Sequence, residues 1–422
     1  MRQIALDVHR DFCEVAIGED GKVRLAGRIA TTPEELELFG QSLSSEDEVV
    51  LEATGNALAI ARVLEPYVAR VVLADPKAVR AAARGRAKTD RIDARLLARM
   101  LAAGFLGEVW AADERTRAWR RLIARRTQLV RQRTREKNQV HAVLMRTLAG
   151  RPPVTDLFGK GGRRWLASLA LAPDERLTVD GCLRHIDLLD EEVALVEQAI
   201  ARETLASAEM RRLLTIPGFN AVSACALMAA IGDIGRFPTA RHLVGYLGLD
   251  PRVSQSGNEA ARHGRISKQG PGSARHVLVE AAWHLARSVG PMRAFHARIA
   301  ARRGANVATV AVARKVVVIA WHMLRDGEDY AYARPSLTRE KIRRLELLTG
   351  APRQRGKAHA ERVFAPRRQH QLERELAAQA ETAYRRLTID WQQRGASRGD
   401  GRGRRSGARM VKSPEGTSNA AG

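Results

Sequence analysis

The chain has 422 residues and is 45% hydrophobic, which is enough for two or three domains with packed cores and excludes a chain that is disordered throughout. Lysine and arginine number 71 against 47 acidic residues, so the formal net charge is +24 and the sequence pI is about 11.1. A charge of this size and sign is typical of proteins that bind a polyanion. Nucleic acid is therefore the leading candidate partner.

The charge is distributed unevenly along the chain. Residues 1–75 carry 14 acidic and 7 basic side chains, whereas residues 76–150 carry 6 acidic and 19 basic ones. An acidic region followed by a basic one indicates a cation-dependent site next to a surface that holds phosphates. The alternative is a basic helix whose charges are simply solvated.

Neither secretion nor membrane insertion is expected. The N-terminus reaches Asp7 before an apolar segment of signal-peptide length can form. The apolar stretch 307–324 contains Arg314 and Lys315 near its centre, where a membrane span would not place them. We therefore expect a cytoplasmic protein, associated with the nucleoid and without a membrane partner.

The N-terminal region predicts an α/β domain. Alternating apolar and polar residues indicate three strands in a meander, at 3–8, 12–17 and 22–29. A helix at 34–42, a buried strand at 48–52, a helix at 58–65 and a strand at 70–74 follow. Strands followed by helix–strand alternation fit a mixed sheet flanked by helices.

The rest of the chain reads as mostly helical. Residues 116–148 are rich in arginine and free of glycine and proline until the end, which predicts a long helix or a helical hairpin of coiled-coil type with a basic outer face. Further helices are predicted at 191–214, 274–287 and 306–324. The tail from about residue 394 is rich in Arg, Gly and Ser and is expected to be disordered, because it has too few apolar groups to offset its ordering entropy.

Residues 216–234 resemble a helix-hairpin-helix element. Pro217 and Gly218 form a turn that leads directly into a helix of small residues. Backbone N–H groups at such a turn can bind a DNA phosphate without reading sequence. A closely packed alanine helix would show the same pattern, so both interpretations stay open.

These features predict five regions. They are an α/β domain at 1–110, a helical linker at 111–205, a mostly helical C-terminal domain at 206–330, a helical basic extension at 331–390 and a disordered basic tail at 391–422.

Four carboxylates are the candidate metal ligands. Asp7 lies in the first strand, Glu52 ends a buried strand, and Asp90 and Asp93 share one face at the start of a helix because they are three residues apart. Magnesium prefers hard oxygen ligands, and two ions can stabilise the attacking and leaving oxygens of a phosphoryl displacement. Each residue alone could instead be a helix cap or a solubilising charge.

A second candidate site follows Gly248. The segments 248–257 and 263–270 combine glycine turns with basic side chains and two serines, Ser254 and Ser256. A serine hydroxyl there could attack phosphorus and form a phosphoserine link that preserves the bond energy for rejoining. On chemistry alone an ordinary Ser-Gly turn is the stronger interpretation.

Three motifs carry a resemblance to the DEDD transposases of the IS110 family. They are Leu6-Asp7-Val8-His9, Leu51-Glu52-Ala53-Thr54-Gly55 and Lys88-Thr89-Asp90-Arg91-Ile92-Asp93-Ala94, and the resemblance extends to about residue 355. It implies a ribonuclease H-like domain of the Holliday-junction-resolvase (RuvC) type for residues 1 to about 110. It also implies a C-terminal transposase domain whose nucleophilic serine precedes glycine, which falls on Ser256. Ser254 is the second candidate, and Gln255 replaces the second serine of many members.

The resemblance implies a bridge-RNA-guided serine recombinase. Its partners would be donor and target DNA and a structured guide RNA, its cofactor Mg²⁺, with two ions expected and Mn²⁺ as an alternative, and its assembly a homo-oligomer, either a dimer or a tetramer. The nucleic-acid contacts we predict are Lys88, Arg91, Arg125, Arg126, Arg131, Arg252, Arg265 and Lys268.

The rival functions differ in which of the two candidate sites, the carboxylates and Ser256, they would need. A metal-dependent endonuclease of the Holliday-junction type would need the carboxylates but not Ser256. A DNA invertase of the pilin-inverting kind would share both motifs but act on fixed sites. A non-catalytic nucleic-acid-binding protein would use neither.

Overall fold

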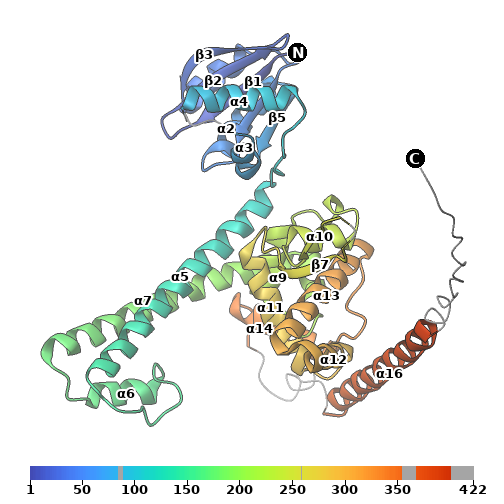
Figure 1. Ribbon diagram of the computed structural model, residues 1–422. Helices are drawn as coiled ribbons and strands as arrows, with labels where there is room; N and C mark the ends of the chain where they lie inside the picture. Colours follow the sequence, from blue (N-terminus) through green and yellow to red (C-terminus); the bar gives the residue numbers. More distant parts are fainter. Residues whose placement is uncertain (84–88, 258, 354–366, 401–422) are drawn as a thin grey trace, which may run out of the picture. The chain divides into compact units, whose positions relative to one another are not determined.

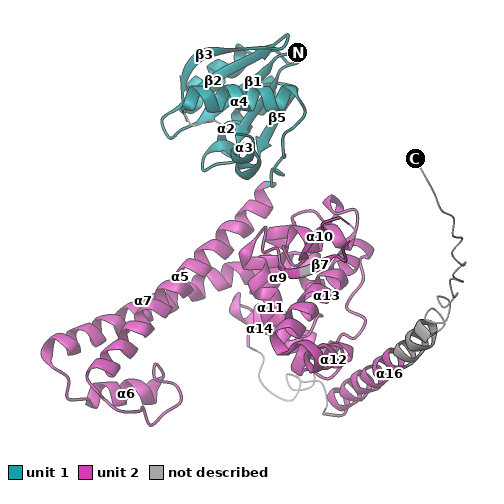
Figure 2. Cartoon of the chain, in the orientation of Figure 1, with its two compact units in different colours: residues 1–113 teal, residues 114–422 magenta. Residues whose placement is uncertain are grey.

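The computed structural model describes residues 1–83, 89–257, 259–353 and 367–400 (Figure 1). The chain forms two compact units (Figure 2). Unit 1 comprises residues 1–113, and unit 2 begins at Glu114. Each unit has a hydrophobic core of its own.

Unit 1 is built on a five-stranded mixed sheet, as the alternation pattern predicted. Strands β1 (Gln3–Val8), β2 (Phe12–Glu19) and β3 (Lys22–Ala30) form an antiparallel meander. Strand β4 (Glu48–Glu52) is parallel to β1, and β5 (Arg70–Ala74) is parallel to β4. The order β3-β2-β1-β4-β5 places β1 at the centre, so its carboxyl end lies beside that of β4.

Helices cover both faces of this sheet. Because strand side chains alternate between faces, one set of apolar residues packs against α1 (Pro33–Gln41) and α2 (Ala57–Leu64), and the other against α4 (Asp90–Ala102). Helix α3 (Pro76–Ala82) was not predicted, since it is short and buries only Val79, which leaves no periodic pattern to detect. A short 3₁₀ turn, Glu65–Tyr67, follows α2.

Unit 2 begins with an antiparallel pair of long helices, α5 (Glu114–Arg146) and α7 (Pro173–Ala206). Trp119 donates a hydrogen bond to Glu203, 2.8 Å away, whereas Arg146 at the other end of α5 pairs with Glu175. Helix α6 (Lys160–Ser168) packs at that second end in a small core of its own. Helix α7 begins well before the predicted residue 191, with Pro173 at its first turn, a position where proline is tolerated.

The remainder of unit 2 is mostly helical, as expected, around one large core. Its elements are α8 (Ala208–Leu213), η2 (Ile234–Arg236), α9 (Ala221–Ile231), α10 (Ala240–Tyr246), the hairpin β6 (Pro251–Ser254) and β7 (Arg262–Ile266), α11 (Gly272–Arg287), α12 (Pro291–Arg303), α13 (Ala305–Asp326) and α14 (Pro335–Leu348).

Helix α9 is buried along nearly its whole length. All its residues except Val222 are buried, and the preceding Gly218 is so close to α11 that a Cβ there would lie 2.8 Å from the Cβ of His284. The closely packed alanine helix therefore describes α9 well. The helix-hairpin-helix role of this segment stays a prediction.

Among the described residues, α13 alone is long and apolar enough to cross a membrane. Its apolar side chains, such as Val312 and Val316, are buried in the core of unit 2. Arg314 on the same helix forms an ion pair with Asp250, 3.0 Å away. These are the features of a core helix in a folded domain.

The C-terminal helix α16 (Arg367–Asp400) extends further than predicted. Residues 391–400 were expected to be disordered, but they continue this helix, and the rest of the predicted tail, 401–422, lies outside the described residues, as does 354–366 of the predicted extension. The buried carboxylate of Glu381 anchors α16 to α12 by accepting hydrogen bonds from the N–H of Gly290 and from Arg293. Extending an anchored helix costs less than nucleating one, which explains the additional turns.

Candidate active site

Two acidic residues lie at the carboxyl ends of neighbouring parallel strands. Leu6 of β1 pairs with Leu51 of β4, so the next residues, Asp7 and Glu52, lie at the same edge of the sheet. The residues two positions earlier in each strand belong to the core beneath α4. Since side chains two apart point to the same face, both carboxylates lie on the α4 side of the sheet.

The first turn of α4 supplies two more carboxylates. Thr89 caps this helix, because its side chain accepts a hydrogen bond from the N–H of Ile92 at 3.4 Å. Asp90 and Asp93 lie in the first turn, where the helix dipole favours negative charge. Helix α4 packs against β1 and β2, which brings its first turn to the end of β1.

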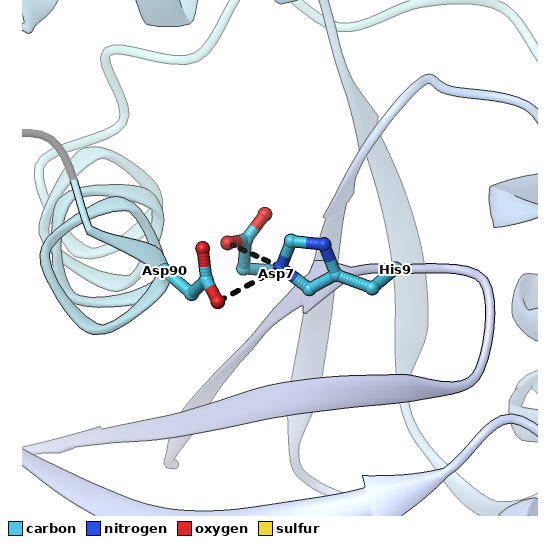
Figure 3. Close-up of side chains that lie close together, drawn as sticks. All are labelled: Asp7, His9 and Asp90. Carbon is cyan, nitrogen blue, oxygen red and sulfur yellow. Dashed lines mark ion pairs between the residues drawn. The ribbon is translucent and has the colours of Figure 1, made fainter.

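A histidine completes the closest group of side chains at this edge (Figure 3). The Nε2 atom of His9 lies 3.4 Å from an oxygen of Asp7 and 3.4 Å from an oxygen of Asp90. One ligand atom from each of the three residues lies within 4.8 Å of the other two. Glu52 and Asp93 are near this group through the sheet register and the helix turn, but neither belongs to it.

The electrostatics of Asp7 reflect this crowding. The pKa of Asp7 is raised to about 6, chiefly by burial and also by the neighbouring carboxylates of Asp93 and Asp90, while His9 opposes the shift. Holding Asp7 ionised beside the other carboxylates is therefore costly in the protein alone. A divalent cation between these carboxylates would offset that cost.

The residues present fit a divalent metal ion. Carboxylate oxygens are the preferred ligands of Mg²⁺ and Mn²⁺, and a histidine nitrogen is also a common metal ligand. The Nε2 atom of His9 is buried and, among the described residues, has no hydrogen-bond partner. An orphaned ring nitrogen facing two carboxylates is what a cation would satisfy.

Sequence reasoning missed a fifth carboxylate near this edge. Glu14 of β2 is the register partner of Asp7, and its side chain is buried. It pairs with Arg28 at 2.7 Å and lies 3.4 Å from Arg91, which we had predicted to contact phosphate. The side chain of Arg91 is nevertheless 68% exposed, so it stays accessible to a ligand.

The candidate nucleophiles lie on the β6–β7 hairpin. Ser254 pairs with Arg262 across the two strands, and Ser256 is exposed in the connecting loop. The carbonyl of Ser256 accepts a hydrogen bond from the N–H of Glu259 at 3.2 Å. In the part of the chain that the structure describes, no side chain hydrogen-bonds the Ser256 hydroxyl, so no general base is identified.

The base of this hairpin is held by close backbone contacts. A Cβ on Gly248 would lie 2.0 Å from the carbonyl oxygen of Gln269, and one on Gly270 would lie 2.0 Å from that of Tyr246. Both glycines also have positive φ values, +68° and +83°. Arg275 of α11 donates to the carbonyls of Gln269 and Gly270, at 2.9 and 3.1 Å. These contacts fix where the hairpin leaves the core.

The predicted phosphate contacts on the hairpin remain accessible. Arg265 and Lys268 are exposed, and neither forms an ion pair with another described residue. Arg252 donates to the carbonyl of Ser267 at 3.5 Å, a long contact that leaves most of its guanidinium available. Lys88 lies outside the described residues.

The predicted contacts on α5 divide into two kinds. Arg125 pairs with Glu192 at 3.1 Å and Arg126 with Glu197 at 2.6 Å, so both are engaged by α7. Arg131 is exposed and lines a groove of about 800 Å³ beside α9 and the start of α11. Arg126 and Arg131 both line a neighbouring cavity, but of the three arginines Arg131 alone forms no ion pair with another described residue.

Two family models match different parts of this chain. A family model for IS110-type DEDD transposases matches residues 4–148, and the model of the transposase IS116/IS110/IS902 family matches residues 210–297. The chain is 29% identical over 299 residues to the transposase for insertion sequence element IS1111A of Coxiella burnetii, covering 67% of this chain and 79% of the relative. It is 27% identical over 297 residues to the transposase for insertion sequence element IS1328 of Yersinia enterocolitica, covering 67% and 85%. Together these matches support a DEDD transposase of the IS110/IS116 family.

The two matches coincide with the two sites. The DEDD match contains Asp7, Glu52, Asp90 and Asp93, and the IS116/IS110/IS902 match contains Ser254 and Ser256. The activity of such a transposase implies a DNA substrate that is cleaved and rejoined.

Proposed function

We propose that this transposase cleaves and rejoins the DNA of an insertion sequence by using a divalent metal ion at the carboxylates and Ser256 as nucleophile. The observation that carries the proposal is the group formed by Asp7 and Asp90, two carboxylates held together at the end of the central strand where burial raises the pKa of Asp7 to about 6. Glu52 and Asp93 would complete the ligand set. A bound Mg²⁺ or Mn²⁺, singly or as a pair, would polarise the phosphodiester and stabilise negative charge on its oxygens.

The covalent step belongs to Ser256. Its Oγ would attack phosphorus, forming a serine–phosphate bond while the bond from phosphorus to the departing sugar oxygen breaks and the serine proton passes to that oxygen. Attack on this phosphorus by the hydroxyl of another strand would break the serine–phosphate bond and join the new strand, and the proton of that hydroxyl would pass to the serine Oγ and regenerate the serine. Two observations support this role: Ser256 is exposed, and close backbone contacts at Gly248 and Gly270 hold the base of its hairpin.

The fold proposed for unit 1 is of the ribonuclease H-like, RuvC type. Support comes from the mixed sheet, in which an antiparallel meander is extended by two parallel strands, and from carboxylates at the ends of its two central parallel strands. The resemblance of the motifs supplies the rest.

The nucleic-acid surface of unit 2 would include the groove beside α5. Arg131 lines this groove together with Arg135, and both are exposed without an ion pair among the described residues. Gly270 and Ser273, which border the same groove, continue directly from the hairpin that carries Ser256. A phosphate backbone held by the two arginines could therefore lead to the nucleophile.

The guide RNA, the homo-oligomer and the nucleoid location are supported by the family resemblance. A structured RNA that pairs with donor and target DNA would supply sequence choice, because the positively charged surfaces described above provide phosphate contacts rather than base-specific ones. A dimer or tetramer would bring several copies of both sites to one pair of DNA substrates.

Trapping a covalent protein–DNA adduct tests the proposal. We expect full-length Ser256→Ala to lose both the adduct and strand exchange, while Ser254→Ala keeps both and serves as the matched control. Asp90→Ala should lose metal-dependent cleavage. An adduct that survives Ser256→Ala would move the nucleophile, and cleavage without exchange in that variant would favour a metal-dependent junction endonuclease.

A further inference from the structure

His9 is the only histidine in residues 1–113, and it lies two positions after Asp7 in the turn between β1 and β2. Its buried Nε2 is directed at Asp7 and Asp90 (Figure 3). Both separations are 3.4 Å, longer than the roughly 2.7–2.9 Å of a hydrogen bond between a charged nitrogen and a carboxylate. The ring nitrogen therefore faces two carboxylates without a well-formed bond to either.

The rest of the His9 residue is firmly held. Its ring packs against Phe12, with the ring centroids 4.7 Å apart, and the guanidinium of Arg28 covers Phe12 at 4.3 Å. The His9 N–H donates to the carbonyl of Phe12 at 2.9 Å, and the His9 carbonyl accepts from Asn56 at 3.1 Å. Such support on the backbone and the ring is what a preorganised ligand requires.

We propose that the Nε2 of His9 is a ligand of the divalent metal ion, together with Asp7 and Asp90. This inference rests on the proposed metal site and adds one nitrogen to a set otherwise made of oxygens. Ligand atoms about 2.0–2.2 Å from one ion can lie up to about 4.4 Å apart, and the two 3.4 Å separations fall inside that range.

A nitrogen ligand changes the ion that the site prefers. Mg²⁺ is held almost entirely by oxygen. Mn²⁺ also prefers oxygen, but as a first-row transition-metal ion it accepts an imidazole nitrogen more readily than Mg²⁺ does. The site should therefore bind Mn²⁺ more tightly than Mg²⁺, and His9 should be responsible for most of the difference. Removing the imidazole should lower Mn²⁺ affinity at least tenfold and affect Mg²⁺ affinity less.

The test uses the full-length chain with Mn²⁺ alone, so that activity is not the readout. Pulsed electron paramagnetic resonance of bound Mn²⁺ should show coupling to a ¹⁴N nucleus, and His9→Gln should abolish that coupling. His141→Gln is the matched control, because His141 belongs to unit 2 and packs on Phe158. Titration calorimetry gives the Mn²⁺ and Mg²⁺ affinities of the same proteins, and the wild-type spectrum is informative even if His9→Gln folds poorly.

The outcomes separate this inference from the proposed function. Three results together would overturn the role of His9 and leave the carboxylate site intact. They are Mn²⁺ binding that is lost in Asp7→Asn, no ¹⁴N coupling in the wild type, and unchanged Mn²⁺ affinity in His9→Gln. Absence of Mn²⁺ and Mg²⁺ binding to the wild type would instead overturn the metal site itself. Coupling that disappears only in His9→Gln supports the ligand.

Discussion

Glu14 and Arg28 form an ion pair directly beside the candidate metal site: the Nε of Arg28 lies 2.7 Å from a Glu14 oxygen, and the Glu14 side chain is only 3% exposed. Arg91 approaches the other oxygen at 3.4 Å. Because Glu14 is the register partner of Asp7, an uncompensated charge there would add to the repulsion within the site. The two arginines balance the negative charge of this fifth carboxylate.

Replacing Arg28 should therefore destabilise unit 1. Arg28→Met leaves the buried Glu14 with only the longer Arg91 contact. Because the Arg28 side chain is 55% exposed, solvent screens this pair, and we expect a loss of about 1–2 kcal/mol, less than the cost of breaking a fully buried pair. Hydrogen exchange of the β1 and β2 amides, followed by mass spectrometry, would measure the loss of opening free energy.

The matched control is Arg24→Met on the same strand. Arg24 is exposed and forms no ion pair among the described residues, so its replacement should change the opening free energy by less than about 0.5 kcal/mol. Equal effects of the two substitutions would show that the Glu14 pair does not stabilise the sheet.

The groove beside α5 makes a prediction about nucleic acid. Arg131→Gln should weaken binding of duplex DNA uniformly across sequences and reduce the slope of log affinity against log salt by about 1, because one phosphate contact is lost. Arg126→Gln, whose parent side chain is engaged by Glu197, should leave both quantities close to wild type. A fluorescence-anisotropy titration at several salt concentrations measures them. Equal losses in the two variants would argue against the groove as the binding surface.

The fold of unit 1 was accessible from its sequence because each strand carries its own signal. Alternation over residues 3–8 and 12–17 and the apolar run before Glu52 depend only on neighbouring residues, and the observed strands confirm them. The same local signals placed Asp90 and Asp93 on the first turn of a helix. Short α3 lacked such a signal.

Relationships between distant charges could not be predicted in the same way. In the sequence, Arg125 and Arg126 look like free phosphate contacts in a basic helix. In the structure, both form ion pairs with glutamates of α7 that lie more than 60 residues later in the chain. His9 stood within the first motif without an indicated role, because the turn that aims it at Asp90 depends on where α4 packs. The one available signal was its position two residues after Asp7.

The base of the serine hairpin makes a third prediction. Gly248→Ala would place a Cβ 2.0 Å from a backbone carbonyl oxygen in a residue with φ +68°, so the hairpin must shift. We expect strand exchange and the Ser256 adduct to fall at least tenfold while Mn²⁺ affinity at the carboxylates is unchanged. Gly245→Ala is the control, because its Cβ would meet only the end of the Asp250 side chain at 3.3 Å. Undiminished adduct formation in Gly248→Ala would mean that hairpin placement does not limit the nucleophile.

The buried position of Asp7 predicts how metal binding depends on pH. Burial is the main reason that the pKa of Asp7 rises from an ordinary 3.8 to about 6, so the metal-free fold favours the protonated carboxyl. The contribution of this protonated group to the stability of the fold is lost as pH rises through 6. A cation binds only the ionised form, and protons therefore compete with it below that value. Mn²⁺ affinity should be level above about pH 7 and fall at least roughly tenfold for each pH unit below 6, because Asp7 must be ionised and a ligating imidazole must be unprotonated. Calorimetry between about pH 7.5 and 5 measures this dependence.

Asp11→Asn, at an exposed carboxylate of the same turn, should reproduce the wild-type curve. His9→Gln should keep the part of the fall that is due to Asp7, at its lower affinity. An affinity that stays level down to pH 5 would show that Asp7 titrates as an ordinary carboxylate or is not a ligand.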